Sequence, residues 1–330
     1  MVLWGHGRMN PAADRPERLI SDAPVDDSAL PFAVEPLDVR GRLVRLGPAL
    51  DAILARHAYP EPVSRLLAEA AVLTTMLGTA LKSKGRLQLQ TRSDGPVQML
   101  VVDFDAPDRL RAYAQFDASR LAAQDDTSGA ALLGHGHLAL TIDHGGAASR
   151  WQGVVALDGQ GLSAAAHHYF AQSEQIPTFV KMAVAELLTA EGRQWRAGGL
   201  MVQHLPSHPT RTADLDPGDA PLGFIADVAD ENEPWNEALA LAGTVGDDEL
   251  VEPDLSGERL LYRLFHERGV KVFPAQSVRD QCRCSQEGVE SMLRGFSAKE
   301  RAEMVNADGR IDVTCAFCST LRIFDPADFA

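Results

Sequence analysis

The segment GRLQLQTRSDGPVQMLVVDF, residues 85–104, sets the architecture of the first half of the chain. Leu87 and Leu89 alternate with polar residues before the turn Ser93-Asp-Gly-Pro96, and a mainly apolar run follows it. Alternation with a period of two is typical of a strand, and a Gly-Pro turn between two such runs predicts a hairpin. We therefore expect a mainly antiparallel sheet.

The neighbouring segments extend this sheet and cover it. Apolar residues recur every three and four positions after Pro48 and again after Pro62, which predicts two amphipathic helices packed on the sheet. Further strands are expected at residues 110–116, 137–143, 151–157, 178–187 and 200–205, and a helix at 161–175. Residues 37–206 are therefore predicted to form an N-terminal α+β domain.

Length and composition set the wider limits. The chain has 330 residues, enough for about two domains, and its 45% hydrophobic and 23% charged content excludes fibrous or wholly disordered chains. The longest apolar stretch, Ala70–Leu81, is shorter than the ~20 residues that cross a bilayer. Residues 1–36 lack both a secretory signal and sustained periodicity, so they are predicted to be a mobile leader of a cytoplasmic protein.

The charge is concentrated in one segment. The formal net charge is −15, and residues 212–258 contain fourteen Asp or Glu and no Lys or Arg. Such an acidic balance argues against a nucleic-acid partner. Residues 207–275 are predicted to be an acidic, partly helical linker, with helices near 234–243 and 255–268. Repulsion among its carboxylates should leave this linker metastable.

All four cysteines lie in the last 55 residues, at Cys282, Cys284, Cys315 and Cys318. Two close pairs of thiolates separated by a long insert are typical of tetrahedral zinc, with a zinc to sulfur distance near ~2.3 Å. The second pair is expected at the tip of a hairpin, between a strand at 311–313 and another at 321–323. Residues 276–330 are therefore predicted to be a small zinc-binding domain, to which the metal contributes on the order of 10 kcal/mol of folding free energy.

An inert structural zinc site is one interpretation, and two features favour a redox switch instead. Cys282 and Cys284 are separated by a single residue, so they can form a tight, strained and reducible disulfide once the metal leaves. The domain also adjoins the acidic linker, to which its unfolding can be transmitted. Thiolates held by zinc are the form that peroxide attacks where they are accessible.

Other classes of protein have weaker support. A thiol-disulfide oxidoreductase needs its Cys-x-x-Cys at the start of a helix, whereas a strand is expected after Cys318. A zinc ribbon for nucleic acid conflicts with the acidic charge. His135, His137 and His144 are interpreted as partly exposed strand residues, and His167 and His168 as helix residues, rather than as metal ligands. No motif supports an enzyme.

The cysteine spacing, with the upstream helix Leu261-Tyr-Arg-Leu-Phe-His-Glu267, resembles the redox-regulated heat-shock protein 33 chaperone family. The resemblance covers residues 37–330. It includes the following segments of the first domain: Ser93-Asp-Gly-Pro96, Trp151-Gln-Gly-Val-Val155, Tyr169-Phe170, Ser173-Glu-Gln-Ile-Pro-Thr178 and Ala197-Gly-Gly199. The leader has no clear counterpart in the family, and the linker is unusually acidic.

The resemblance implies a cytoplasmic, ATP-independent holdase that is inactive when reduced and bound to one Zn²⁺. Oxidation would then form disulfides Cys282–Cys284 and Cys315–Cys318 and release the zinc. By similarity, the zinc domain and then the linker unfold, which exposes apolar surface that captures unfolding client proteins and favours a homodimer. Neither a nucleic acid nor a membrane is an expected partner.

Overall fold

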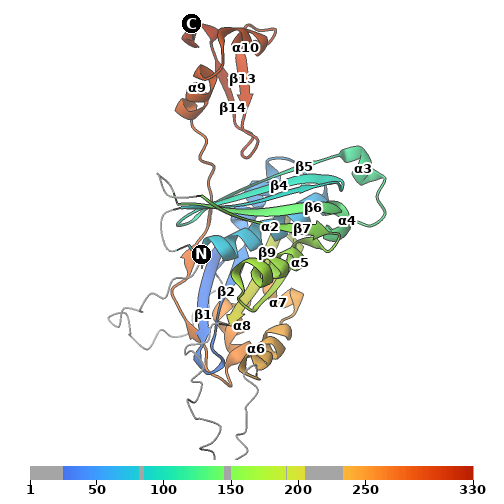
Figure 1. Cartoon of the computed structure of the whole chain (residues 1–330), viewed down its shortest axis with the longest axis vertical. Coiled ribbons are helices and arrows are strands. Elements are labelled where there is room, and N and C mark those ends of the chain that lie inside the picture. The colour runs from blue at the N-terminus through green and yellow to red at the C-terminus, as the bar shows by residue number, and fades with distance from the viewer. Residues whose placement is uncertain (1–24, 82–84, 145–149, 191, 205–232, 330) are drawn as a thin grey trace, which may run out of the picture.

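The computed structural model describes residues 25–81, 85–144, 150–190, 192–204 and 233–329. Predictions for residues 1–24 of the leader and 205–232 around the start of the linker lie outside these ranges. The described residues form two six-stranded sheets, the linker helices and a two-stranded C-terminal unit, and this confirms the α+β class. Figure 1 shows the C-terminal unit at one end of the molecule and the linker helices at the other.

Sheet A contains the strands at the two ends of the N-terminal domain. Its order is β10-β1-β2-β9-β8, with β11 also paired to β1, and every described pair in it is antiparallel. The strands are β1 (Ser28–Val34), β2 (Val39–Leu46), β8 (Thr178–Thr189), β9 (Gly192–His204), β10 (Lys271–Val272) and β11 (Gln276–Ser277). A three-residue 3₁₀ turn, Glu35–Leu37, joins β1 to β2.

Sheet B contains the predicted hairpin. Its order is β12-β5-β4-β3-β6-β7, and β3 and β4 pair with Leu87 opposite Phe104, which confirms the hairpin. The strands are β3 (Arg86–Ser93), β4 (Val97–Asp105), β5 (Arg109–Phe116), β6 (His135–Asp143), β7 (Trp151–Asp158) and β12 (Arg279–Asp280). The short strand β12 runs parallel to β5, so the chain returns to this sheet just before the first cysteines.

One helix separates the two sheets. Helix α2 (Glu61–Gly78) contacts β3, β4 and β5 of sheet B and β2, β8 and β9 of sheet A, so the apolar run from Ala70 is core. The other helices of this region are α1 (Pro48–Ala55), α3 (Ala118–Ala122), α4 (Gly129–Leu133) and α5 (Gly161–Tyr169), with a π turn at Phe170–Glu174. In the described part of the chain no helix has the length and apolar character needed to cross a bilayer.

The linker helices cover the outer face of sheet A. They are α6 (Glu233–Gly243), α7 (Asp247–Val251) and α8 (Gly257–Phe265). The helix expected near residues 255–268 is confirmed as α8, and its apolar residues Leu260, Leu261, Leu264 and Phe265 are all buried. Phe265 stacks on Phe32 of β1 with ring centres 5.6 Å apart, so the linker shares one apolar core with the sheet.

Two expectations were wrong. The leader was predicted to extend through residue 36, but Ser28–Val34 is a strand of sheet A. Pro31 obscured its pattern, and the structure tolerates this proline because its nitrogen lies at the gap between β10 and β11, where no ladder bond is lost. The strands were also expected in one sheet, whereas α2 divides them into two.

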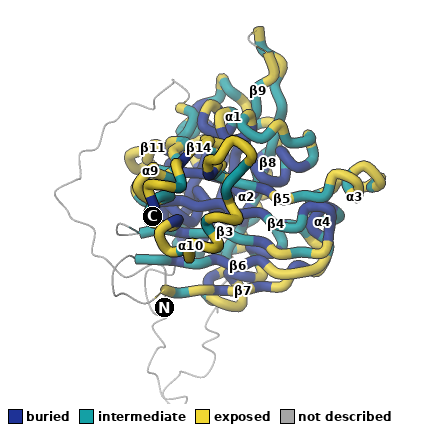
Figure 2. The backbone as a smooth tube through the Cα atoms, turned by 90° about the horizontal axis from the view of Figure 1, so that it is seen from above, coloured by how far each residue is buried: buried dark blue, intermediate teal, exposed yellow. Residues whose placement is uncertain are grey.

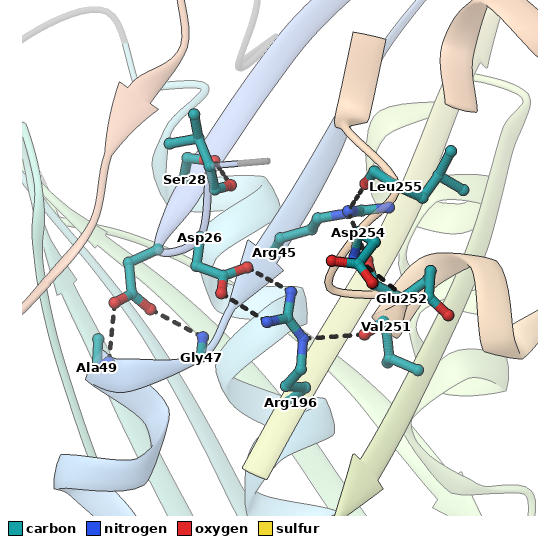
Figure 3. Close-up of polar contacts among 12 residues, drawn as sticks. Asp26, Ser28, Arg45, Gly47, Ala49, Arg196, Val251, Glu252, Asp254 and Leu255 are labelled. Atoms are coloured by element: carbon teal, nitrogen blue, oxygen red, sulfur yellow. Dashed lines mark hydrogen bonds and ion pairs between the residues drawn. The ribbon is translucent and has the colours of Figure 1, made fainter. Parts of the chain in front are cut away.

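Two arginines from sheet A bind the backbone of the linker (Figure 3). Arg45 donates from Nη1 to the Glu252 carbonyl at 3.0 Å and from Nη2 to the Glu249 carbonyl at 2.9 Å, and it also reaches the Leu255 carbonyl. Arg196 donates from Nε to the Val251 carbonyl at 2.9 Å. We call Arg45 and Arg196 the arginine clamp. It caps the C-terminal carbonyls of α7, which a helix leaves without intrahelical partners.

The surroundings of the clamp allow this close contact. Arg196 also forms an ion pair with Asp26, in the segment just before β1. Gly198 of β9 makes room for α7, because a Cβ there would lie 2.1 Å from the Leu250 carbonyl oxygen. Two acidic residues of the linker also form ion pairs with arginines, Glu249 with Arg263 and Glu237 with Arg268. These pairs offset part of the predicted repulsion.

We expect Arg196→Met to loosen the linker without unfolding the core. Removing a charged donor from a buried carbonyl costs about 1.5–3 kcal/mol, which corresponds to amide exchange roughly 10–100 times faster in peptides covering residues 247–255. Hydrogen–deuterium exchange of the reduced protein measures this, with peptides of α2 as the internal reference. Arg193→Met is the control, because Arg193 lies on the same strand but pairs with Glu186 at the surface. Unchanged exchange in Arg196→Met would contradict the clamp.

Glu69 of α2 should make stability depend on pH. It lines a pocket of about 480 Å³ between α2, β8 and the α7 region, and burial raises its pKa to about 7 while Arg65 acts in the opposite direction. Because the pKa of the folded state lies above that of the unfolded chain, stability is lost as pH rises from about 4.5 to 7. Glu69→Gln should therefore stabilise the protein by about 1–3 kcal/mol at pH 8 and little at pH 4.5. Urea unfolding at both pH values measures this, with Asp125→Asn at an exposed position of the same domain as the control. Equal effects at the two pH values would contradict the assignment.

Candidate metal centre

Four thiols from two segments meet at the base of the C-terminal unit. Cys282 and Cys284 follow β12, and Cys315 and Cys318 lie between β13 (Ile311–Thr314) and β14 (Leu321–Phe324). Their sulfur atoms all lie within 4.8 Å of one another. Cys282 Sγ is 3.8 Å from Cys315 Sγ, and Cys284 Sγ is 3.4 Å from Cys318 Sγ. A tetrahedral zinc with ~2.3 Å bonds separates its sulfurs by about 3.8 Å, so the donor set fits this metal.

The hairpin tip has the predicted form. Thr314 is paired with Leu321, which leaves six residues to turn the chain. The Cys315 backbone N–H donates to the Thr320 carbonyl at 3.0 Å, and the Ser319 N–H donates to the Cys315 carbonyl at 2.9 Å. Ser319 adopts a left-handed conformation, with φ of 54°, to close this turn. The turn holds both cysteines on the side of Cys282 and Cys284.

The C-terminal unit has little core of its own. Its buried apolar residues are Leu293, Ile311, Phe324 and Phe329. In helix α9 (Gln286–Arg294), Leu293 is buried but Met292 is 48% exposed. A capping box of Ser297 and Glu300 begins α10 (Ala298–Glu303). Figure 2 shows mostly exposed and intermediate residues in α9, α10 and β14. A metal bound at the cysteine cluster would add to the stability of a unit with so small a core.

The four thiols are not equivalent. Burial raises the pKa of the Cys284 thiol to about 12 and also raises that of Cys315. Burial acts in the same direction on Cys318, but hydrogen bonds from the Thr320 hydroxyl and backbone N–H and from neighbouring thiols lower its pKa to about 6. The Thr320 hydroxyl lies 3.2 Å from Cys318 Sγ. Cys318 therefore takes the thiolate form required of a metal ligand more readily than Cys284 or Cys315.

The cluster rests on sheet B through a buried charge network. Asp103 of β4 is fully buried and accepts hydrogen bonds from Arg111 Nε at 2.9 Å and Gln88 Nε2 at 2.8 Å. Arg111 Nη1 is 3.7 Å from Cys282 Sγ, and Arg283 Nη2 is 3.7 Å from Asp103 Oδ2. Sequence reasoning did not predict these residues. The single acid in the apolar run VVDF was the available signal, since a buried carboxylate needs a cation.

The five histidines that the sequence analysis considered as metal ligands are not part of this cluster. His135 and His137 are exposed on β6, as predicted, and His144 follows the end of that strand. His167 and His168 lie in α5, where His167 Nε2 accepts the Val180 backbone N–H. Among the described residues, the four cysteines are the one group of His, Cys, Asp or Glu side chains close enough to hold a metal ion.

Comparison with known proteins agrees with this arrangement. The family model described as Hsp33 protein matches residues 27–325. The chain belongs to the Hsp33 family. A 33 kDa chaperonin of Caulobacter vibrioides (strain NA1000 / CB15N) is 42% identical over 306 residues, covering 92% of this chain and 96% of the relative. A 33 kDa chaperonin of Pseudomonas fluorescens (strain SBW25) is 35% identical, covering 94% and 95%.

A solved structure supports the same fold. The crystal structure of a 33 kDa chaperonin from Thermotoga maritima superposes with a TM-score of 0.71 at 20% identity. It covers 92% of this chain and 96% of its own. At that identity the superposition establishes the fold alone, and Hsp33 membership rests on the family model and the curated relatives.

Cys315→Ser should weaken zinc binding on the order of a hundredfold or more, because a hydroxyl replaces one of four thiolates. Competition with a chromophoric chelator on the reduced protein measures the affinity. Ala316→Ser is the matched control, since it adds the same hydroxyl at an exposed position in the same turn without removing a thiol. Equal zinc affinity in Cys315→Ser and the wild type would remove Cys315 from the ligand set.

Proposed function

We propose that this Hsp33 family member is a redox-regulated, ATP-independent holdase chaperone. In the reduced state Cys282, Cys284, Cys315 and Cys318 would hold one Zn²⁺ and keep the protein inactive. The observation that carries this proposal is the gathering of four thiols in a unit with a very small apolar core. Oxidising these thiols would remove the metal ligands that supplement the small core of that unit.

The proposed chemistry is a four-electron oxidation. Each disulfide forms when one thiolate attacks a peroxide oxygen and a second thiolate displaces the resulting hydroxyl from sulfur. Two molecules of hydrogen peroxide take up four electrons and four protons and leave as four waters. Four thiolates thereby become two disulfides, and the zinc ion leaves because a disulfide sulfur is a poor ligand.

We propose the pairs Cys282–Cys284 and Cys315–Cys318. All four sulfurs lie within 4.8 Å of one another, and Cys282 and Cys284 contact Cys315 and Cys318 at 3.8 and 3.4 Å, so the folded geometry does not itself favour the local pairs. Once the unit unfolds, however, each of these pairs closes a very short loop, whereas Cys282 and Cys315 are 33 residues apart. Closing a short loop costs less entropy, which favours the local pairs.

The connection from the metal centre to the linker is short. Gln281 donates its backbone N–H to the Leu110 carbonyl of β5 at 3.1 Å, directly before Cys282. The strands β12, β11 and β10 then lead back to α8 within about fifteen residues. Losing the metal centre therefore frees the two-residue strands that anchor the linker, and we infer that α6–α8 follow.

Release of the linker would expose the surface that binds clients. Beneath α6–α8, sheet A presents Leu30, Phe32, Leu43, Leu200 and Val202, all now buried. An apolar sheet face of this kind binds unfolding polypeptides, and a second copy of the chain could cover part of it, which is consistent with a homodimer on activation. We place the protein in the cytoplasm, because four free thiols persist only in a reducing compartment.

The test compares reduced and peroxide-treated full-length protein on a thermally unfolding client such as citrate synthase. The oxidised form should suppress light scattering at about equimolar ratio and the reduced form should not. Zinc release and free thiols are counted on the same samples, and one zinc per chain should leave as four thiols are lost. Ala316→Ser should switch normally, whereas Cys315→Ser should no longer respond to peroxide.

Two results would contradict the proposal. Equal suppression before and after oxidation would indicate a binding protein with a structural metal site. Catalytic reduction of insulin disulfides would indicate an oxidoreductase, although Cys315 lies in a hairpin turn rather than at a helix N-terminus.

A further inference from the structure

The side chain of Phe317, a residue of the C-terminal unit, packs on sheet B of the N-terminal domain. It lies between two of the clustered cysteines but is not part of the buried core of the C-terminal unit. The centre of its ring is 3.8 Å from the guanidinium carbon of Arg111, a cation–π contact, and 6.2 Å from the ring centre of Tyr113. Figure 1 shows the loop between β13 and β14 directed toward β5.

The backbone of Phe317 is also recognised. His57, just after α1, has Nε2 at 3.2 Å from the Phe317 carbonyl oxygen. A carbonyl oxygen only accepts, so Nε2 carries the proton. The other ring nitrogen, Nδ1, is 3.3 Å from the Ser319 hydroxyl, which is equally close to the Arg56 carbonyl oxygen. The N-terminal domain therefore binds both the aromatic ring and the backbone carbonyl of Phe317.

We call Arg111, Tyr113 and His57 the aromatic seat, and its parts are held in place without the C-terminal unit. Arg111 is anchored by the fully buried carboxylate of Asp103. His57 stacks on Tyr59 at 5.0 Å and contacts Tyr113 at 5.9 Å. The Tyr59 hydroxyl accepts the Ala114 backbone N–H at 3.0 Å, which ties this row of rings to β5. The seat should therefore persist after the hairpin tip departs.

We propose that the aromatic seat is a binding subsite for an aromatic side chain of a client polypeptide, and that Phe317 occupies it in the reduced protein. A ring would lie on Arg111 against Tyr113, and the carbonyl of the same residue would accept from His57. The proposal rests on the proposed function, because oxidation must free Phe317. It specifies aromatic side chains as the class of client residue bound. It also places the binding subsite on the opposite side of the molecule from the linker helices.

The chemistry of the seat selects aromatic over aliphatic residues. A guanidinium over a ring face gains electrostatic energy from the ring quadrupole, which a leucine or cyclohexyl group lacks. Folded proteins bury their Phe side chains, whereas unfolding proteins expose them. A subsite of this kind therefore recognises a feature of unfolded chains through a contact that apolar burial alone does not provide.

The test uses reduced Phe317→Ala, in which the seat is vacated without oxidation. Phe317 contributes nothing to the buried core of its unit, so this variant should retain zinc, which is measured first. The probes are acetyl-Gly-Ser-Phe-Ser-Gly-amide and its cyclohexylalanine analogue, followed by amide chemical shifts of β5. The Phe peptide should bind the variant about three to ten times more tightly than the analogue, and wild type at least about tenfold more weakly than the variant.

Further variants make the result specific. In the Phe317→Ala background, Arg111→Lys keeps a charge for Asp103 but removes the planar cation, and it should abolish the preference for the Phe peptide. Gln115→Ala is the control, since Gln115 is an exposed residue of the same strand, two positions after Tyr113, and it should leave the preference unchanged. Should Phe317→Ala lose zinc, Phe317→Leu retains apolar bulk and should bind the Phe peptide to an intermediate degree.

The outcomes separate the two proposals. Equal binding of both peptides by zinc-loaded Phe317→Ala, or no binding at all, would overturn the aromatic seat. Binding by reduced Phe317→Ala together with no binding by oxidised wild type would support the seat and contradict the release of Phe317 on oxidation.

Discussion

Four sulfur atoms from two segments of the chain lie within 4.8 Å of one another. The C-terminal unit they join has four buried apolar side chains in its core, few to hold its backbone in place against conformational entropy. A metal bound by these thiols would supply the missing free energy, and thiolates are also the group most easily oxidised. The same four atoms would then provide both the stability of this unit and its sensitivity to oxidants.

The N-terminal domain and the linker helices are connected to this oxidisable unit. Sheet A, sheet B and α2 form an extensive core that does not involve the cysteines. The linker helices lie on this core and share apolar contacts with sheet A, and the arginine clamp binds the backbone of α7. The strands β10, β11 and β12 join the linker to the metal centre, and each has only two residues. The stable core of the N-terminal domain is thus covered by linker helices that are joined to the metal centre through three two-residue strands.

Much of the fold and the whole cysteine cluster could be predicted from local patterns. The stripe of α8 and the hairpin of β3 and β4 are visible because their periods repeat within a few residues. Strand β1 was missed because Pro31 interrupts its pattern and its partner, β2, had not been assigned as a strand. The division into two sheets was missed because α2 separates them in space and leaves no mark on the order of strands along the chain.

The sequence by itself determined which residues can hold a metal, since four cysteines in two close pairs restrict the chemistry wherever they lie. Only the tertiary structure decided what surrounds them. Arg111 is 171 residues from Cys282, and Arg45 is 207 residues from Glu252. No local period encodes such contacts, because they arise when distant strands are packed side by side. The aromatic seat that Phe317 occupies and the arginine clamp that binds the linker both result from that packing.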